Sequence, residues 1–238
     1  MADRPDPALG VFTTMLVRDG AAVDLRAHLA RLERSVAELY GQKLPSELEP
    51  RIAATAAGER LLRMRVLVRP ASGPRPLVEL DARPLDREPE PQPAVLAPAY
   101  LPGGLGAHKW RDRRLLDRLE HSLGALPLIV DLDDEALEAA TANVLIVEGA
   151  TVVTPPLDGR LLPGTVRERA LAAAPAAGLR AAEEPITLER LAAADEVLLS
   201  SAISGVRPAA LAGNAAPSFE VGARLRESLQ ELVSVEAP

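Results

Sequence analysis

The chain contains only two lysines, Lys43 and Lys109, among its 27 basic residues, so arginine supplies the other 25. A lysine amine can lose its proton and attack a carbonyl, whereas a guanidinium stays protonated. Forming an imine with a carbonyl is therefore a task that arginine cannot take over. Lys109 lies in the segment HKWRDR (108–113), which also holds the only tryptophan. Lys109 is thus a candidate nucleophile, and the alternative is a surface lysine without a chemical role.

Three further segments carry residues that could act together with Lys109. They are HLARL (28–32), EAATAN (138–143) and TPPLDGRLLPGTVR (154–167). Taken alone, Arg31 could belong to the solvated face of a charged helix, Glu138 could be a solvated strand residue, and Gly164 could mark a turn. His28 and Trp110 are more typical of packing than of ligand binding, and the three scattered histidines predict no metal site.

Composition excludes several classes of function. The chain has no cysteine, which removes disulfides, thiolate zinc sites and a cysteine nucleophile. Its formal net charge is −7 and it has no basic block, so nucleic acid is not an expected partner. No apolar run reaches the roughly 18 residues of a membrane helix, and the N-terminus is polar. We therefore expect a cytoplasmic protein that binds a small molecule and no membrane.

Hydrophobic periodicity predicts a mixed α/β chain of the α+β kind, without internal repeats. Helices are expected at 24–39, 47–57, 111–123, 166–174, 188–193 and 221–233, the first with Asp24 as its N-cap. Strands are expected at 11–17, 61–68, 77–80, 94–97, 128–130, 136–139, 144–147, 151–153, near Leu179 and at 196–200. The strands cluster instead of alternating regularly with helices.

Two stretches predict the division into domains. Residues 87–93 (REPEPQP) place proline at every second position, which favours an extended connector. Residues 101–106 (LPGGLG) are flexible in composition. We expect a small N-terminal domain over 1–100, a linker over 101–105 and a larger C-terminal domain over 106–238.

The four segments occur in an order that resembles the class IV, fold-type IV pyridoxal-phosphate enzymes. The pattern E-x-x-x-x-N, then T-P-x-L, then L-P-G-x-x-R is characteristic of that family. The resemblance runs from about Gly10 to Pro208. It implies a two-domain fold like that of D-amino acid aminotransferase, with the cofactor in a cleft between the domains. It also implies a homodimer.

Within this family, the chain is most similar to the 4-amino-4-deoxychorismate lyases. The segment Phe12-Thr13-Thr14, followed by a turn and the H-x-x-R-L helix, resembles those lyases. So does Lys109 with Arg113 four residues later. Transaminases of the family usually carry threonine where Ala202 stands, and often where Val166 stands.

The resemblance implies roles for single residues. Lys109 would bind pyridoxal 5′-phosphate covalently and then act as base and acid at the substrate carbon. Glu138 would keep the pyridine nitrogen protonated, so that the ring can take up electrons. Arg31 would bind the phosphate with its planar fork, beside the N–H groups of a helix N-terminus. The other implied cofactor-binding residues are Asn143, Gly164, Thr165, Val166, Ser201 and Ala202, with Ser200 also at the end of that strand.

The implied activity is cleavage of 4-amino-4-deoxychorismate to 4-aminobenzoate and pyruvate, which feeds folate biosynthesis. The substrate carries two carboxylates, and the residues considered for substrate binding are Thr13, Arg113, Arg160 and Arg207. One alternative is a class IV transferase, an aminotransferase acting on branched-chain or D-amino acids. Another is a non-catalytic relative that keeps the fold, against which the presence of Lys109 and Glu138 argues.

Overall fold

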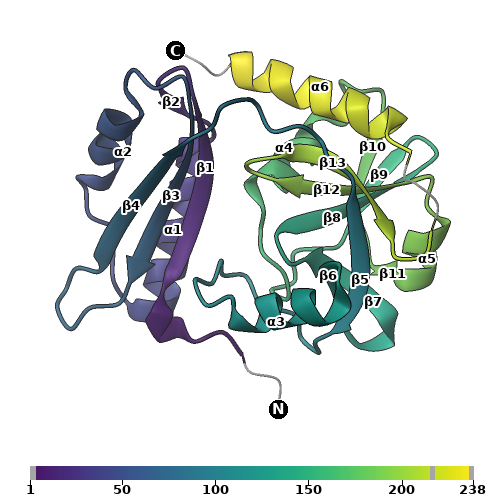
Figure 1. The fold of residues 1–238 in the computed structure, drawn as a ribbon, viewed down its shortest axis with the longest axis horizontal. Helices are drawn as coiled ribbons and strands as arrows, with labels where there is room; N and C mark the ends of the chain where they lie inside the picture. The colour runs from purple at the N-terminus through teal and green to yellow at the C-terminus, as the bar shows by residue number, and fades with distance from the viewer. Residues whose placement is uncertain (1–3, 215–217, 236–238) are drawn as a thin grey trace. The chain divides into compact units, whose positions relative to one another are not determined.

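The computed structural model describes residues 4–214 and 218–235, and the chain divides into two compact units (Figure 1). Of the described residues, the smaller unit contains 4–89 and 108–113, and the larger contains 90–107 and the remainder from 114 onward. The expected boundary at residues 101–105 therefore differs from the division found. Strand β5 (Ala94–Tyr100) pairs with strands of the larger unit, and the segment 108–113 belongs to the smaller one.

The smaller unit is a four-stranded antiparallel sheet with the strand order β2-β1-β3-β4. Its elements are η1 (Pro7–Leu9), β1 (Val11–Arg18), β2 (Ala21–Ala22), α1 (Leu25–Tyr40), α2 (Leu48–Ala56), β3 (Leu61–Arg69) and β4 (Leu77–Pro84). Alternate residues of β1 and β3, such as Met15 and Met64, join helix residues such as Leu32 and Ile52 in one apolar core. The opposite face of these strands carries Phe12 and several arginines, as the period of two requires.

In its described residues, the larger unit contains a nine-stranded sheet and four α-helices. Its further strands are β6 (Leu126–Val130), β7 (Glu135–Ala139), β8 (Ala142–Glu148), β9 (Thr151–Thr154), β10 (Arg180–Glu183), β11 (Ile186–Thr187), β12 (Glu196–Ser201) and β13 (Gly205–Leu211). Its helices are α3 (Arg114–Leu123), α4 (Thr165–Ala173), α5 (Leu188–Ala193) and α6 (Glu220–Val235), with the short η2 (Leu132–Asp134).

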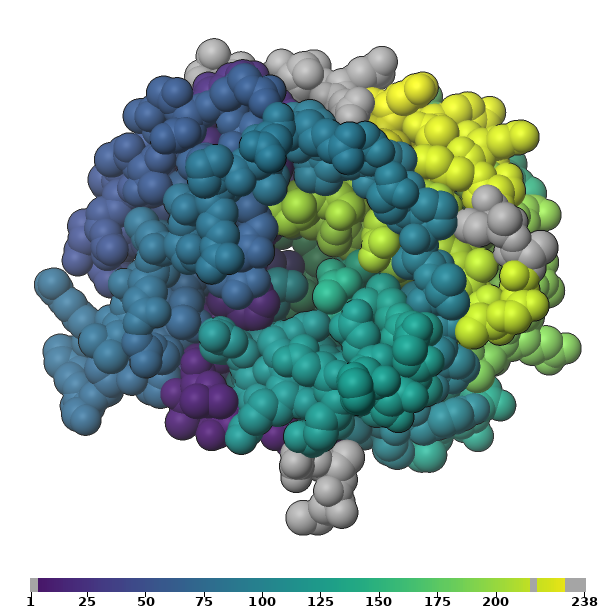
Figure 2. Space-filling view, viewed as in Figure 1, coloured from purple at the N-terminus to yellow at the C-terminus, as the bar shows by residue number. Residues whose placement is uncertain are grey.

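A pairing between β7 and β8 closes the middle of this sheet into a six-stranded barrel of β8, β12, β13, β5, β6 and β7. One apolar cluster takes residues from all six strands and fills the barrel, for example Leu96, Val144 and Leu199. Two other clusters cover the outside of the strands beneath α4 and α6 and beneath α3. Part of α6 is visible in yellow at the surface in Figure 2.

Most predicted elements are confirmed, but the short strands β2 and β11 were not predicted, and three further corrections apply. Asp24 does precede α1, but its backbone is left-handed (φ 55°) and its side chain makes no capping hydrogen bond. The helix expected from Arg111 begins at Arg114, because the residues before it pair with β1. Strand β13 was not expected, since Pro208 and alanines obscure its pattern. Across the described residues, no helix has the length and apolar character needed to cross a membrane.

Candidate functional site

Lys109 is fixed through its backbone to the first strand of the smaller unit. The Phe12 N–H donates to the Lys109 carbonyl at 2.9 Å, and the Arg111 N–H donates to the Gly10 carbonyl at 2.9 Å. Trp110 forms an isolated β-bridge with Val11, and its ring packs against the apolar core, as expected of this residue. The Lys109 ammonium lies 5.1 Å from the centroid of the Phe12 ring. Lys109, the candidate amine nucleophile, is therefore held beside the ring of Phe12.

Arg31 belongs to a buried polar group on the other face of β1. Its Nη2 donates to the Thr13 hydroxyl at 3.0 Å, and this hydroxyl lies 2.8 Å from Nδ1 of His28. All three side chains are buried, so the solvated-face interpretation of Arg31 is wrong. Thr13, considered for substrate binding, has its hydroxyl engaged by these two neighbours. The group holds the Arg31 guanidinium in one orientation.

His28 in this group is an uncharged imidazole. Its pKa is lowered to about 3, first by burial and then by the nearby cations Arg31 and Lys109. The expectation that His28 packs inside the unit is confirmed, because it is 1 % exposed. Its hydrogen bond to Thr13 adds a role that the sequence pattern did not indicate.

In the larger unit, three polar side chains form a row across neighbouring strands. Glu138 of β7 stands opposite Asn143 of β8, and Asn143 stands opposite Ser200 of β12. Directly opposite residues project from the same face of a sheet. All three are at most 6 % exposed, so the interpretation of Glu138 as a solvated strand residue is wrong.

A β-bulge places Glu138 on that face. Val130 pairs with Ala136, but the next pair along β6 is Ile129 with Glu138, which leaves Leu137 as the extra residue. In a regular strand, where alternate residues share a side, Glu138 would lie on the side of Ala136, which faces the barrel interior. The bulge instead turns the carboxylate to the outside of the barrel. One of its oxygens accepts the N–H of Leu162 at 3.3 Å.

The row holds the loop that leads into α4. The Asn143 amide donates to the Leu162 carbonyl at 2.8 Å, which is the backbone contact expected of Asn143. Gly164, the N-cap residue of α4, lies against the same side chain, and a Cβ at this position would stand 1.9 Å from Oδ1 of Asn143. Because glycine provides no side chain, the first N–H groups of α4 have no side-chain cap from this residue. Such a helix start favours an anion.

Val166 and Ala202, the two positions where transaminases of the family carry threonine, pack into the apolar cluster near the start of α4. Val166 is buried in the cluster under α4, and Ala202 packs against the same cluster, while Thr165 is buried in the first turn. The Ser201 hydroxyl accepts the Ser204 N–H at 3.3 Å and so closes a turn. By contrast, the buried Ser200 hydroxyl has no hydrogen-bond partner among the described residues. A buried hydroxyl of this kind is suited to a ligand.

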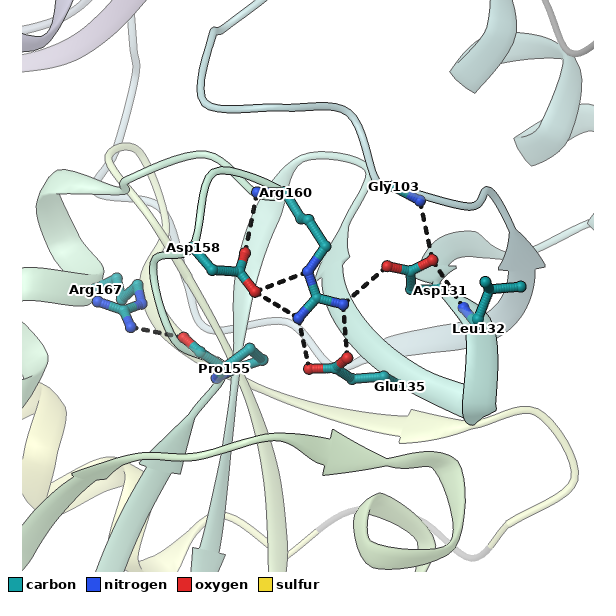
Figure 3. Close-up of polar contacts among 8 residues, drawn as sticks. All are labelled: Gly103, Asp131, Leu132, Glu135, Pro155, Asp158, Arg160 and Arg167. Carbon is teal, nitrogen blue, oxygen red and sulfur yellow. Dashed lines mark hydrogen bonds and ion pairs between the residues drawn. The ribbon is translucent and has the colours of Figure 1, made fainter.

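Arg160 is excluded as a binder of a substrate carboxylate (Figure 3). Its five N–H donors are all used by carboxylates of Asp131, Glu135 and Asp158, at 2.5 to 2.9 Å. These partners raise the pKa of Arg160, and they hold the pKa of Asp131 at about 2 together with the N–H groups of Gly103 and Leu132. The sequence could not show this, because the three acids come from separate turns.

The Arg160 cluster joins two loops of the larger unit. The Asp131 carboxylate accepts the Gly103 N–H at 2.9 Å, and the Arg160 carbonyl accepts the Gly106 N–H at 3.1 Å. A Cβ at Gly104, whose φ is +60°, would lie 2.1 Å from that carbonyl, so only glycine fits. The cluster is therefore structural, and it fixes the chain just before Leu162 and Gly164.

The final arginine of the L-P-G-x-x-R motif, Arg167, has a positioning role that was not predicted. It is 2 % exposed and donates to the Pro155 carbonyl at 2.7 Å (Figure 3) and to Glu183 at 2.6 Å. Arg167 thereby ties the T-P-P turn to α4, which explains why the two motifs occur together. Arg207 on β13 is partly buried, donates to the Gln92 carbonyl and has a lowered pKa because of burial. Arg113 is partly buried in the smaller unit, and its role stays a prediction.

The family description that matches the chain is amino-transferase class IV, over residues 10–212. Solved structures with similar folds include a hypothetical aminotransferase from Mycobacterium tuberculosis in its PLP-bound form, with a TM-score of 0.80 and 20 % identity over 100 % of this chain and 94 % of that one. Another is a putative 4-amino-4-deoxychorismate lyase from Legionella pneumophila, with a TM-score of 0.76 and 19 % identity over 94 % and 91 %.

A putative branched-chain amino acid aminotransferase from Thermotoga maritima has a TM-score of 0.78 and 22 % identity, over 94 % of this chain and 86 % of that one. Comparison with curated proteins finds no significant match. At such identities the solved structures establish the fold alone, and they include a putative lyase as well as aminotransferases.

Proposed function

Because the chain belongs to the amino-transferase class IV family, we propose that it is a pyridoxal-phosphate-dependent lyase that converts 4-amino-4-deoxychorismate to 4-aminobenzoate and pyruvate. The product would feed folate biosynthesis. The observation that carries the proposal is the pairing of Lys109 with Phe12. The F-T-T segment that resembles the lyases is also the segment that fixes the backbone of Lys109.

The side chains present fit pyridoxal phosphate. Arg31, buried and oriented by Thr13, offers a planar pair of donors for a phosphate. The start of α4 at Gly164 offers backbone N–H groups without a side-chain cap, and the unpartnered Ser200 hydroxyl offers a further polar contact. Glu138 is a buried carboxylate that can face a protonated ring nitrogen. Val166 and Ala202 contribute no hydroxyl, so in this proposal the phosphate would depend on Arg31 and on backbone N–H groups.

When bound, the cofactor supplies a carbonyl for the lysine amine and an electron-withdrawing ring. Lys109 would provide the amine nitrogen that takes the proton from the amine-bearing carbon of the substrate. That carbon carries no hydrogen in the aromatic product, so the balancing proton goes to the methylene of the departing enolpyruvyl group, which becomes the methyl group of pyruvate. Glu138 would keep a proton on the ring nitrogen, and its contact with the Leu162 N–H holds the carboxylate in place. Departure of the enolpyruvyl group as pyruvate leaves an aromatic ring, which drives the reaction forward.

A transaminase acting on branched-chain or D-amino acids is the second candidate. The observation that favours it is the description of the family that matches the chain, amino-transferase class IV. Phe12-Thr13-Thr14 and Ala202 favour the lyase.

One assay separates the two candidates. Purified holoenzyme is given 4-amino-4-deoxychorismate, and release of 4-aminobenzoate is followed by its fluorescence. In parallel, the same preparation is given branched-chain or D-amino acids with 2-oxoglutarate, and glutamate is measured. Release of 4-aminobenzoate that disappears in Lys109→Arg supports the lyase, because a guanidinium cannot replace the amine. Rapid amino-group transfer without 4-aminobenzoate would show that the chain is a transaminase.

A further inference from the structure

Two cationic groups share the Phe12 ring on the outer face of the small sheet. The Arg65 guanidinium carbon lies 4.6 Å from the ring centroid, and the Lys109 ammonium lies 5.1 Å from it. The two distances together place both groups within about 10 Å of each other, on a ring that is 6 % exposed. Arg65 is therefore close to the reactive amine, although it lies outside every sequence motif.

Arg65 has no carboxylate of its own among the described residues. It stands opposite Asp81 in the register of β3 and β4, but Asp81 pairs with Arg83 at 3.2 Å and with Arg63 at 3.6 Å. Arg65 instead turns over Phe12, and within the described part of the chain its side chain makes one hydrogen bond, a long one of 3.5 Å from Nε to the Thr14 hydroxyl. Most of its N–H donors are thus available, in contrast to Arg160, whose five donors are all used.

The surroundings of Arg65 favour an incoming anion. Burial lowers the pKa of Arg65 most, and the neighbouring cations Arg63, Arg111 and Arg83 lower it further, against the single opposing charge of Asp81. Arginine stays protonated under such conditions. A half-buried cation among cations is stabilised when a carboxylate binds to it. The site thus has both the charge and the free donors that a substrate carboxylate needs.

We propose that Arg65 binds the ring carboxylate of the substrate, and this inference rests on the proposed lyase function. In 4-amino-4-deoxychorismate this carboxylate lies directly across the six-membered ring from the amine. The amine must approach the position of the Lys109 nitrogen to react. The separation of Arg65 and Lys109, at most about 10 Å, is on the scale of a six-membered ring that carries a carboxylate. Arg65 would then determine specificity for a substrate with a carboxylate opposite its amine.

Binding of two product-like probes to holoenzyme tests this inference without turnover. 4-Aminobenzoate and 4-aminobenzamide share the ring and the amine and differ in the charge of the group across the ring. By titration calorimetry, the wild type should bind the carboxylate roughly ten- to a hundredfold more tightly than the amide. Arg65→Gln should remove this preference while it leaves the melting temperature and the cofactor absorption band unchanged.

Arg83→Gln is the matched control, because Arg83 lies on the same face but is exposed and paired with Asp81. It should keep the wild-type preference. Should Arg65→Gln fail to fold, Arg65→Lys replaces it, and the preference should fall at least severalfold because lysine lacks the planar fork. Equal binding of the two probes by the wild type, or an unchanged preference in the Arg65 variant, would overturn the inference.

The outcomes also separate this inference from the proposed function. Arg65-dependent binding of 4-aminobenzoate without its release from the substrate would support the carboxylate site and reject the lyase. Release of 4-aminobenzoate by an enzyme whose preference does not depend on Arg65 would support the lyase and reject the site.

Discussion

Replacing Thr13 with valine tests the buried group that orients Arg31. Valine has nearly the shape of threonine, so the change removes a hydroxyl without leaving a large cavity. Thr13 is 0 % exposed, and its hydroxyl serves both Arg31 at 3.0 Å and His28 at 2.8 Å. The variant therefore leaves two buried nitrogens without this partner. A buried group that loses its hydrogen bond costs about 1–3 kcal/mol, so the free energy of unfolding should fall by roughly 2–4 kcal/mol.

The same variant should bind pyridoxal phosphate more weakly, because the Arg31 guanidinium is no longer held in one orientation. Urea unfolding measures the first effect, and absorption titration with pyridoxal phosphate measures the second. Pyridoxal, which lacks the phosphate, should lose much less affinity. Thr151→Val is the control, because Thr151 also accepts from an arginine, Arg180, but at an exposed site. Unchanged unfolding and unchanged phosphate-dependent affinity in Thr13→Val would refute the reasoning.

Three further predictions concern stability. Because the pKa of His28 is about 3 when folded, only the unfolded chain takes up a proton here below about pH 6.5. The free energy of unfolding of the wild type should thus fall by up to about 1.4 kcal/mol per pH unit on acidification. In His28→Gln this part of the pH dependence should be missing. Gly164→Ala should lower the free energy of unfolding by about 1–3 kcal/mol, because the added Cβ meets the buried Asn143. Arg160→Gln should lower it by roughly 1–3 kcal/mol near neutral pH. The stability lost in Arg160→Gln should become smaller below about pH 4. The pKa of Asp131 is about 2 in the folded protein, so this carboxylate contributes stability above its pKa in the unfolded chain and loses that contribution as the pH falls.

Each of these has a result that would contradict it. If the free energy of unfolding fell equally with decreasing pH in the wild type and in His28→Gln, His28 would not have the lowered pKa in the folded protein. Gly73→Ala is the control for the glycine change, since nothing lies within 4 Å of its added Cβ, and an equal melting temperature for both alanine variants would remove the steric argument. A pH-independent effect of Arg160→Gln would show that the three carboxylates do not depend on this arginine.

The sequence predicts the elements of the fold well, because apolar periodicity and turn residues are local signals. It also predicts Lys109, Glu138 and Arg31 as residues of interest, since their motifs stand in a fixed order. It does not predict that Leu137 is a bulge residue, because bulges depend on how β6 and β7 pair. The orientation of Glu138 therefore becomes visible only in the structure.

The arginines show the same limit more clearly. Arg160 and Arg207 are equally plausible partners of a carboxylate in a chain with so many arginines. They differ in their contacts in the folded chain, because Arg160 binds three carboxylates that come from separate turns. The sequence does not indicate these contacts. Arg65 was not predicted, because it belongs to no motif and only strand pairing brings it to the Phe12 ring.

The central claim is that Lys109 is the residue that binds the cofactor covalently. Purified protein is incubated with pyridoxal phosphate, reduced with borohydride and digested, and the modified peptide is identified by mass spectrometry. We predict the pyridoxyl group on Lys109, and no modification in Lys109→Arg. A pyridoxyl group on the exposed Lys43, or on neither lysine, would contradict the account.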